Sequence, residues 1–408
     1  MRPDGGNPQP VRLVRPAVAP LSAMAQLGRF VFFDPALSSS GALSCASCHS
    51  PRHAYGPPGD LPVMAGGRAL TRQGARAVPS LMYLERQPNF SIGPDDAESE
   101  AVPAPLPPGG AATAAKQAQN AAQSAQNLVP QGGLFWDGRV NTLQSQALGP
   151  LLNPLEMDGG SVGRVAQRLR RAPYAARFAQ LFGAQIFERP DGMLAEALFA
   201  VARYQIEDPS FHPYSSKYDA WLEGKARFSP AEARGYALFH DPRGANCAAC
   251  HLERPDANGL PPLFTDHQFE ALGVPRNTAL ASNRNQRYFD LGICGPARTD
   301  MTHAAPYCGM FLTPTLRNVA TRHAFFHNGV YRTLQQVLDF YDFRDTRSQR
   351  VYAHRKFDDL PAVYRANIDT VDAPFDRKAG QAPPLTARQE RDIIAFLRTL
   401  TDGYRPPK

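Results

Sequence analysis

Several features that would place the chain in other protein classes are missing from it. No apolar run approaches the roughly 20 residues that a membrane-spanning helix needs, so no transmembrane span is expected. The net charge is +7 without a dense block of Lys or Arg, a pattern typical of solubility or docking and not of nucleic-acid binding. Strand signals are sparse, and the 39 prolines predict loops and extended segments around compact helices. The sequence therefore predicts a mostly α protein.

Cysteine is also scarce, with six residues in 408, yet four of the six form two Cys-x-x-Cys-His motifs. In such a motif the two thiols can form thioether bonds to haem vinyl groups, while the histidine ligates the iron. A single copy also occurs in zinc and redox sites, but two copies with similar upstream sequence favour two covalently bound c-type haems. The first motif consists of Cys45, Cys48 and His49, and the second of Cys247, Cys250 and His251.

The remaining cysteines, Cys294 and Cys308, flank a Gly/Pro-rich stretch. In an oxidising compartment we expect them to form a disulfide, and a pair of free structural thiols is the alternative. Covalent haem attachment normally takes place outside the cytoplasm. The first residues, MRPDG, lack the apolar core of a signal peptide. We therefore expect a periplasmic protein whose export signal has been removed from this chain.

The two halves of the chain repeat. Residues 28–35 (GRFVFFDP) and 235–242 (GYALFHDP) share the pattern G-x-x-x-F-x-D-P, and each runs into one Cys motif. Each copy predicts a short helix that ends in a proline-containing turn just before the haem attachment. We therefore expect two cytochrome c-like helical domains, residues 1–208 and 209–408, with one haem each.

Further helices are expected from apolar periodicity at residues 162–169, 193–204 and 334–341. Ser229 with Glu232, and Thr386 with Gln389, are typical of helix N-termini that close with a capping box. Residues 91–133 differ because they are rich in Pro and Gly, then in Ala and Gln, without an apolar stripe. This composition predicts a flexible or weakly helical surface insertion.

Other ordered motifs accompany the two Cys motifs: FWDGR at 135–139, NPLEM at 153–157, TPTLRNVA at 313–320, HNG at 327–329 and TLQQVLDFY at 333–341. Together they resemble the bacterial di-haem cytochrome c peroxidase/MauG superfamily, and the resemblance spans nearly the whole chain apart from residues 91–133. It implies that the haem of the first motif reacts with peroxide. The haem of the second motif would store and transfer electrons.

The resemblance also implies roles for single residues of the first half. Trp136 of FWDGR would lie between the haems and relay electrons, and simple packing is the alternative. Glu156 of NPLEM would lie over the peroxide-binding iron, where a carboxylate can take a proton from bound peroxide and return it to the departing oxygen. The alternative for Glu156 is a capping or surface acid. Gln146 and Pro150 match positions of the peroxide pocket in MauG-like proteins.

Tyr341 helps to distinguish the MauG-like members of the superfamily from its peroxidases. It lies fourteen residues after His327, where the family's peroxidases carry a methionine ligand to the second iron and MauG carries tyrosine. A phenolate oxygen stabilises oxidised iron, whereas a thioether favours ferrous iron. A helix-packing tyrosine is the alternative, and His327 would lie beside the same haem. Between residues 50 and 80 the only histidine is His53, too close to His49 to reach the opposite face, so we expect the first haem to be five-coordinate.

Calcium is a further implication of the resemblance, bound between the haems by an asparagine side chain and two backbone carbonyls. Here Ala77 stands in the place of that asparagine, and the carbonyl positions fall near Arg322 and Ala324. Calcium prefers a full set of oxygen ligands. The missing oxygen and the neighbouring arginine argue against the site, although backbone and water could complete it.

These features lead to a functional hypothesis. Hydrogen peroxide reacts at the first haem, an oxidising equivalent passes through Trp136 to the second, and the resulting pair of Fe(IV) haems oxidises a small exported partner protein, at a tryptophan side chain. Residues 340–344 and 399–404 resemble the MbnH branch, whose members oxidise a partner's tryptophan. The alternative is a cytochrome c peroxidase that reduces peroxide with electrons from a small cytochrome or copper protein. A di-haem electron carrier without catalysis is a third hypothesis.

Overall fold

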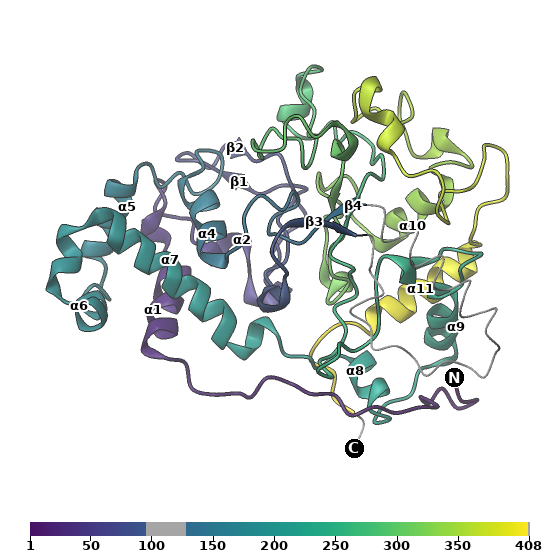
Figure 1. Cartoon of the computed structure of the whole chain (residues 1–408), viewed down its shortest axis with the longest axis horizontal. Helices are drawn as coiled ribbons and strands as arrows, with labels where there is room; N and C mark the ends of the chain where they lie inside the picture. The colour runs from purple at the N-terminus through teal and green to yellow at the C-terminus, as the bar shows by residue number, and fades with distance from the viewer. Residues whose placement is uncertain (95–127, 407–408) are drawn as a thin grey trace.

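Two pairs of packed helices organise the computed structural model, which describes residues 1–94 and 128–406. In the first half α1 (Ala23–Phe32) packs along α7 (Pro190–Glu207), and in the second half α9 (Pro230–Phe239) packs along α11 (Ala387–Arg398). Figure 1 shows the first pair at the left of the molecule and the second pair at the right. The prediction of a mostly α fold is confirmed.

A glycine of the sequence repeat makes each helix contact close. A Cβ atom on Gly28 would lie 1.8 Å from the carbonyl oxygen of Ala200 in α7. A Cβ atom on Gly235 would lie 1.9 Å from the carbonyl oxygen of Asp392 in α11. Any side chain would push the helices apart, so the first position of the repeat serves helix packing in both halves.

The remaining helices have ten residues or fewer, and several short 3₁₀ turns lie between them. They are α2 (Cys45–Cys48), α4 (Leu143–Leu152), α5 (Val162–Arg171), α6 (Ala176–Phe182), α8 (Lys217–Leu222) and α10 (Leu334–Phe343). Among the described residues, strands form only two-stranded antiparallel sheets. These pair β1 (Ala65–Gly66) with β2 (Arg72–Gln73), β3 (Ser91–Pro94) with β4 (Leu128–Gln131), and β5 (Phe269–Glu270) with β6 (Phe311–Leu312).

The predicted helix starts are confirmed. The Ser229 hydroxyl accepts from the Glu232 amide at 3.3 Å, and the Glu232 carboxylate accepts from the Ser229 amide at 2.6 Å. Thr386 and Gln389 form the same capping box at the start of α11. The periodic segments 162–169, 193–204 and 334–341 lie within α5, α7 and α10.

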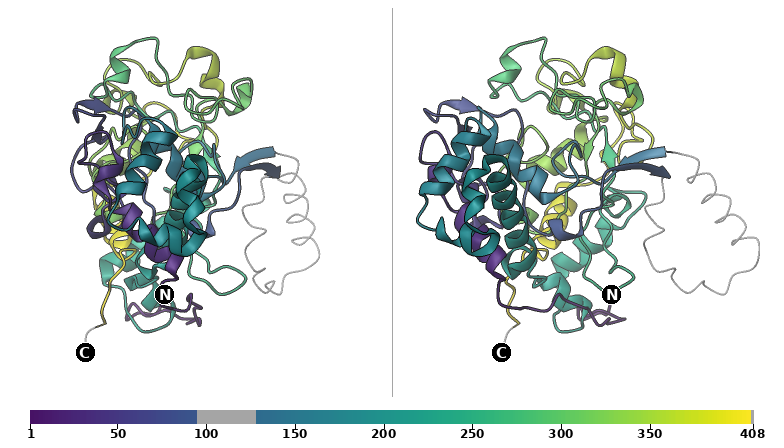
Figure 2. Two further views of the ribbon diagram at one scale, coloured as in Figure 1. Left: turned by 90° about the vertical axis from the view of Figure 1, so that its left-hand side faces the viewer. Right: turned by 60° about the vertical axis from the view of Figure 1, so that its left-hand side comes forward.

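The predicted insertion begins and ends in strands. β3 pairs with β4 so that Ser91 lies opposite Gln131 and Pro94 opposite Leu128, and Figure 2 shows this ribbon projecting from the body of the molecule. The prediction of a flexible or weakly helical segment is therefore wrong for these two ends. The sequences SIGP and LVPQ each contain a proline and do not alternate apolar with polar residues, so they give no strand signal. The rest of the insertion, residues 95–127, lies outside the described residues.

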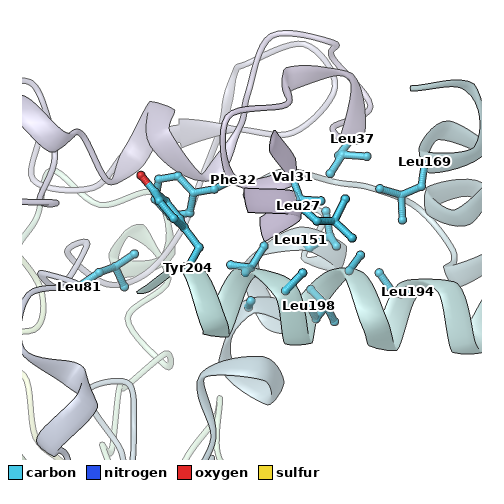
Figure 3. Close-up of a cluster of buried hydrophobic side chains, with 14 of the residues drawn as sticks. Leu27, Val31, Phe32, Leu37, Leu81, Leu151, Leu169, Leu194, Leu198 and Tyr204 are labelled. Carbon is cyan, nitrogen blue, oxygen red and sulfur yellow. The ribbon is translucent and has the colours of Figure 1, made fainter. Parts of the chain in front are cut away.

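Each half has its own hydrophobic core. In Figure 3, side chains of α1, such as Leu27 and Val31, face Leu194 and Leu198 of α7. In the second core the Trp221 ring stacks on Phe228 with centroids 4.6 Å apart. Trp221 is therefore a core residue.

The N-terminal segment packs against the second half. Leu13 belongs to the second core, and the Phe228 amide donates to the Gly5 carbonyl at 3.0 Å. The division of the chain between residues 208 and 209 remains a prediction. None of the described helices is long and apolar enough to span a membrane.

Candidate functional site

A cavity of about 480 Å³ lies beside the second Cys motif and draws on both halves of the chain. Pockets of this size accommodate ligands as large as cofactors, and side chains from α10 and α11 form part of its wall. Residues with predicted roles that line it are Cys247, Cys250, His251, His327, Tyr341, Trp136 and Gln146. The structure thus brings together two thiols, two imidazoles and a phenol around one space.

Both motif histidines are held in the form that can ligate iron. His251 Nδ1 donates to the carbonyl oxygen of Phe264 at 2.9 Å, and His49 Nδ1 donates to that of Tyr55 at 3.1 Å. Burial lowers the pKa of each imidazole to about 4, so both are neutral at pH 7. With the proton on Nδ1, the Nε2 lone pair remains available to a metal ion.

The motif cysteines do not resemble reactive redox thiolates. Burial raises the pKa of Cys45 and Cys247 to about 12, so these thiols stay protonated at neutral pH, unlike reactive thiolates. Across residues 1–94 and 128–406, no three His, Cys, Asp or Glu side chains form a cluster that could hold a metal ion. The lack of such a cluster in this part of the chain disfavours the zinc alternative.

Tyr341 projects from α10 into the same cavity. Burial raises its pKa, and the nearby Cys250 and Cys247 raise it further. Its ring stacks on Phe375 with centroids 5.5 Å apart. The phenol therefore lies close to the second motif, as a ligand to that iron must. Its coordination remains a prediction.

His327 presents an unpaired polar atom to the cavity. Its ring stacks on Phe311 with centroids 3.6 Å apart, and burial lowers its pKa to about 4. The buried Nε2 atom has no hydrogen-bond partner among the described residues and lies 4.0 Å from a carboxylate oxygen of Asp359. Buried polar atoms normally have hydrogen-bond partners, so the Nε2 atom of His327 is suited to bind a polar group inside the cavity.

Trp136 lies where the two halves meet. Its Nε1 donates to the carbonyl oxygen of Ala77 at 2.8 Å, and the Ala77 amide donates to the carbonyl oxygen of His327 at 2.7 Å. The indole is buried and shares the cavity with His251. Its position suits a residue between two redox centres, and its role as an electron relay remains a prediction.

Glu156 lies beside the first motif, in the loop between α4 and α5. Its backbone is held close to the β1–β2 hairpin, since a Cβ atom on Gly66 would lie 2.7 Å from the Glu156 Cα atom. Burial, and then the Glu156 carboxylate, raise the pKa of Cys48 to about 11, so this carboxylate is close to the haem attachment. Although Glu156 is exposed, the surrounding protein desolvates the carboxyl and raises its pKa. Such a group suits proton transfer.

The other two residues predicted for the peroxide pocket lie on α4. Gln146 is buried and lines the cavity of the second motif. Pro150 follows one turn later inside the helix and has no amide to donate to the Gln146 carbonyl. The roles of Gln146 and Pro150 in the peroxide pocket remain predictions. Cys294 and Cys308 form a disulfide with Cα atoms 5.1 Å apart, in a loop whose neighbour Gly309 lines the same cavity.

The place predicted for calcium is taken by an arginine side chain. Arg322 Nη2 donates to the carbonyl oxygen of Val78 at 2.8 Å and lies 3.5 Å from the carbonyl oxygen of Ala324. Ala77 supplies no side-chain oxygen. A guanidinium among the expected ligands repels a divalent cation, so the residues present do not fit calcium.

Sequence reasoning missed an ion network next to Trp136. Arg76 donates to Asp137 at 2.6 Å and, through two nitrogens, to Asp290 at 2.6 and 2.7 Å. The Asp137 side chain is completely buried. The only sequence signal was the aspartate of FWDGR, because Arg76 and Asp290 lie far away along the chain.

Two helical halves, each with a Cys-x-x-Cys-His motif and a neutral, half-buried histidine, define the class of two-haem proteins built from cytochrome c-like domains. Residues 22–227 match a family described as di-haem cytochrome c peroxidase. The chain is 33% identical over 327 residues to the methylamine utilization protein MauG of Paracoccus denitrificans, covering 78% of this chain and 74% of that protein. The chain belongs to the di-haem cytochrome c peroxidase/MauG family.

Solved structures agree with this assignment. The di-haem peroxidase BthA of Burkholderia thailandensis matches with a TM-score of 0.80 and 35% identity, covering 98% of this chain and 91% of that one. A MauG-like protein associated with microbial copper homeostasis matches with a TM-score of 0.61 and 25% identity, covering 97% of this chain and 95% of that one. The chain is therefore a haem-dependent oxidoreductase that uses peroxide, and the family implies two haems. Membership of the MbnH branch remains a prediction.

Proposed function

We propose that this chain is a MauG-like enzyme that uses hydrogen peroxide to remove electrons from a small exported partner protein in the periplasm, with a tryptophan side chain as the expected target. The haems, bound covalently through the two Cys motifs, would supply the redox chemistry by sharing two oxidising equivalents as a bis-Fe(IV) state. His49 would hold one iron, and His251 with Tyr341 the other.

The observation that carries this proposal is Tyr341 in the cavity of the second motif, close to Cys247 and Cys250. An oxygen ligand favours oxidised iron, whereas the methionine expected of a peroxidase favours ferrous iron. The phenol therefore favours a second haem that holds an oxidising equivalent. It does not favour a second haem that supplies electrons to peroxide.

The protein's own groups have separate tasks in this proposal. Glu156, beside the first motif, would take a proton from hydrogen peroxide and return it to the departing oxygen. Trp136 would pass electrons between the two halves, because its indole is buried where they meet. The backbone carbonyls of Tyr55 and Phe264 would hold the two ligating imidazoles in orientation.

One equivalent of hydrogen peroxide added to the di-ferric protein tests the proposal. We expect a long-lived Fe(IV) signal in the Mössbauer spectrum, and its absence would contradict the proposal. Rapid steady-state turnover of peroxide with reduced cytochrome c would instead support the peroxidase alternative.

Replacing Tyr341 with Met or Phe tests the ligand itself. Because the substitution exchanges one donor atom of the second iron, we expect a changed low-spin ferric EPR signal. Tyr364→Phe is the control, since Tyr364 is not part of the cavity lining. If Tyr341→Phe and Tyr364→Phe both leave the spectrum of the wild type unchanged, Tyr341 is not a ligand.

A further inference from the structure

Arg322 reaches from the second half of the chain into the first. It directly follows the 3₁₀ turn Val319–Thr321, and its guanidinium donates to the Val78 carbonyl at 2.8 Å. A Cβ atom on Gly56 would lie 3.4 Å from its Nη1 atom. The guanidinium charge also contributes to lowering the pKa of His49, after the larger effect of burial. This cation therefore lies near the first motif, although its backbone belongs to the second half.

The charge of Arg322 has no counter-ion within residues 1–94 and 128–406. Its acceptors are backbone carbonyls, and burial lowers its pKa to about 10, so it remains a cation at neutral pH. Other arginines that the protein desolvates are paired: Arg317 donates to Asp219 at 2.7 and 3.0 Å, and Arg76 to two carboxylates. Burying a charge without a partner is costly, so an anion is expected to face Arg322 in the complete protein.

The cavity is where that anion can lie. Arg322 forms part of its wall and is only half-buried, so part of its side chain is accessible there. A haem carries two propionate carboxylates, and the planar fork of a guanidinium matches a carboxylate in geometry and charge. The same wall also includes the orphaned Nε2 atom of His327.

We propose that Arg322 is the built-in cation between the two haem sites: it replaces calcium there and is the counter-ion of a haem propionate. The inference rests on the proposed function only in requiring haem at both motifs. It follows that the enzyme works without calcium and that Arg322 sets the electrostatic potential at the neighbouring iron.

Calcium chloride is the probe for the first part of this proposal. We expect no stoichiometric binding when it is titrated calorimetrically into the EDTA-treated holoenzyme, and no change of the haem absorbance on EDTA treatment. Binding of one calcium ion per chain, or a spectrum that EDTA alters and calcium restores, would overturn it. This outcome does not depend on whether the enzyme oxidises a partner.

Substitution of Arg322 tests the second part through the haem reduction potentials. Arg322→Gln keeps a hydrogen-bond donor but removes the positive charge, so ferric iron is stabilised and we expect a potential to shift downward. Arg322→Lys keeps the charge and should restore the potential toward the wild-type value. The control is Arg168→Gln: Arg168 also donates only to carbonyls, those of Leu37 and Gly159 at 2.8 Å, but does not line the cavity.

The reduction potentials are compared only between protein samples whose haem content has been measured. A pyridine haemochrome assay should give two haems per chain in the wild type, and fewer would contradict the proposed function while the calcium titration still decides the inference. If Arg322→Gln shifts neither potential more than Arg168→Gln does, the counter-ion role is wrong. If Arg322→Gln fails to retain haem, Arg322→Lys decides: potentials close to those of the wild type support the role, and loss of haem there as well overturns it.

Discussion

At the scale of single residues, the two motif histidines are prepared in the same way, but different groups surround them. Each imidazole donates Nδ1–H to a backbone carbonyl, and burial keeps each ring neutral. Beside the first motif lies the carboxyl of Glu156, whereas the second shares its cavity with the phenol of Tyr341. A proton-transfer group on one side and an oxygen donor on the other suit two haems with different tasks.

Glu156→Gln should slow the reaction of the di-ferric protein with hydrogen peroxide by about 10²–10⁴-fold, because an amide cannot accept the peroxide proton. Stopped-flow absorbance of the haem measures this rate. Desolvation raises the pKa of Glu156, so this carboxylate becomes protonated at a higher pH than an ordinary glutamate. As the pH is lowered, the wild-type rate should therefore begin to fall at that higher pH. The rate of the glutamine variant should lack this step.

Glu188→Gln is the control for this experiment, because Glu188 is exposed in a 3₁₀ turn away from both motifs. It should leave the rate and its pH profile unchanged. If Glu156→Gln reacts as fast as Glu188→Gln, the carboxyl of Glu156 is not the proton-transfer group.

At the scale of elements, the features that the sequence predicts well are those decided within a few residues. The capping boxes at Ser229 and Thr386 act across three residues, so each helix start is visible in the sequence. The ribbon of β3 and β4 is not visible, because its partners lie across residues 95–127 and each strand is short. The repeated glycine appears in the sequence, but its reason lies in a second helix far along the chain.

Gly28→Ala and Gly235→Ala should each destabilise the protein by about 1–3 kcal/mol, because the added methyl group meets a backbone carbonyl of the partner helix. Thermal unfolding followed by circular dichroism measures the change. Gly163→Ala in α5 is the matched control: a Cβ atom there meets nothing within 4 Å. It should raise stability, by about 0.5–1 kcal/mol. Equal melting temperatures for all three variants would show that the close contacts do not matter.

At the scale of the whole molecule, residues 76–78 join the two halves. Arg76 pairs with Asp290, the Ala77 peptide connects Trp136 with His327, and the Val78 carbonyl accepts from Arg322. The motifs predict most of the groups that meet at the site. They do not predict this junction, because its contacts join residues far apart in sequence and depend on how the halves dock. The sequence places Arg322 near the expected calcium ligands, and the structure adds that its guanidinium donates to the Val78 carbonyl there.

Arg76→Met tests how strongly this junction holds the halves together. The substitution leaves two buried carboxylates, Asp137 and Asp290, without the cation that bridges them, and such a loss typically costs about 3–5 kcal/mol. Because Asp290 belongs to the second half, docking should weaken more than either core, and we expect calorimetry to show two separated unfolding transitions. The double variant Arg76→Met/Asp290→Asn should recover part of the loss, since Asp137 still accepts from Arg139 at 2.8 Å. A single transition at the wild-type temperature would mean that the docked halves do not depend on this bridge.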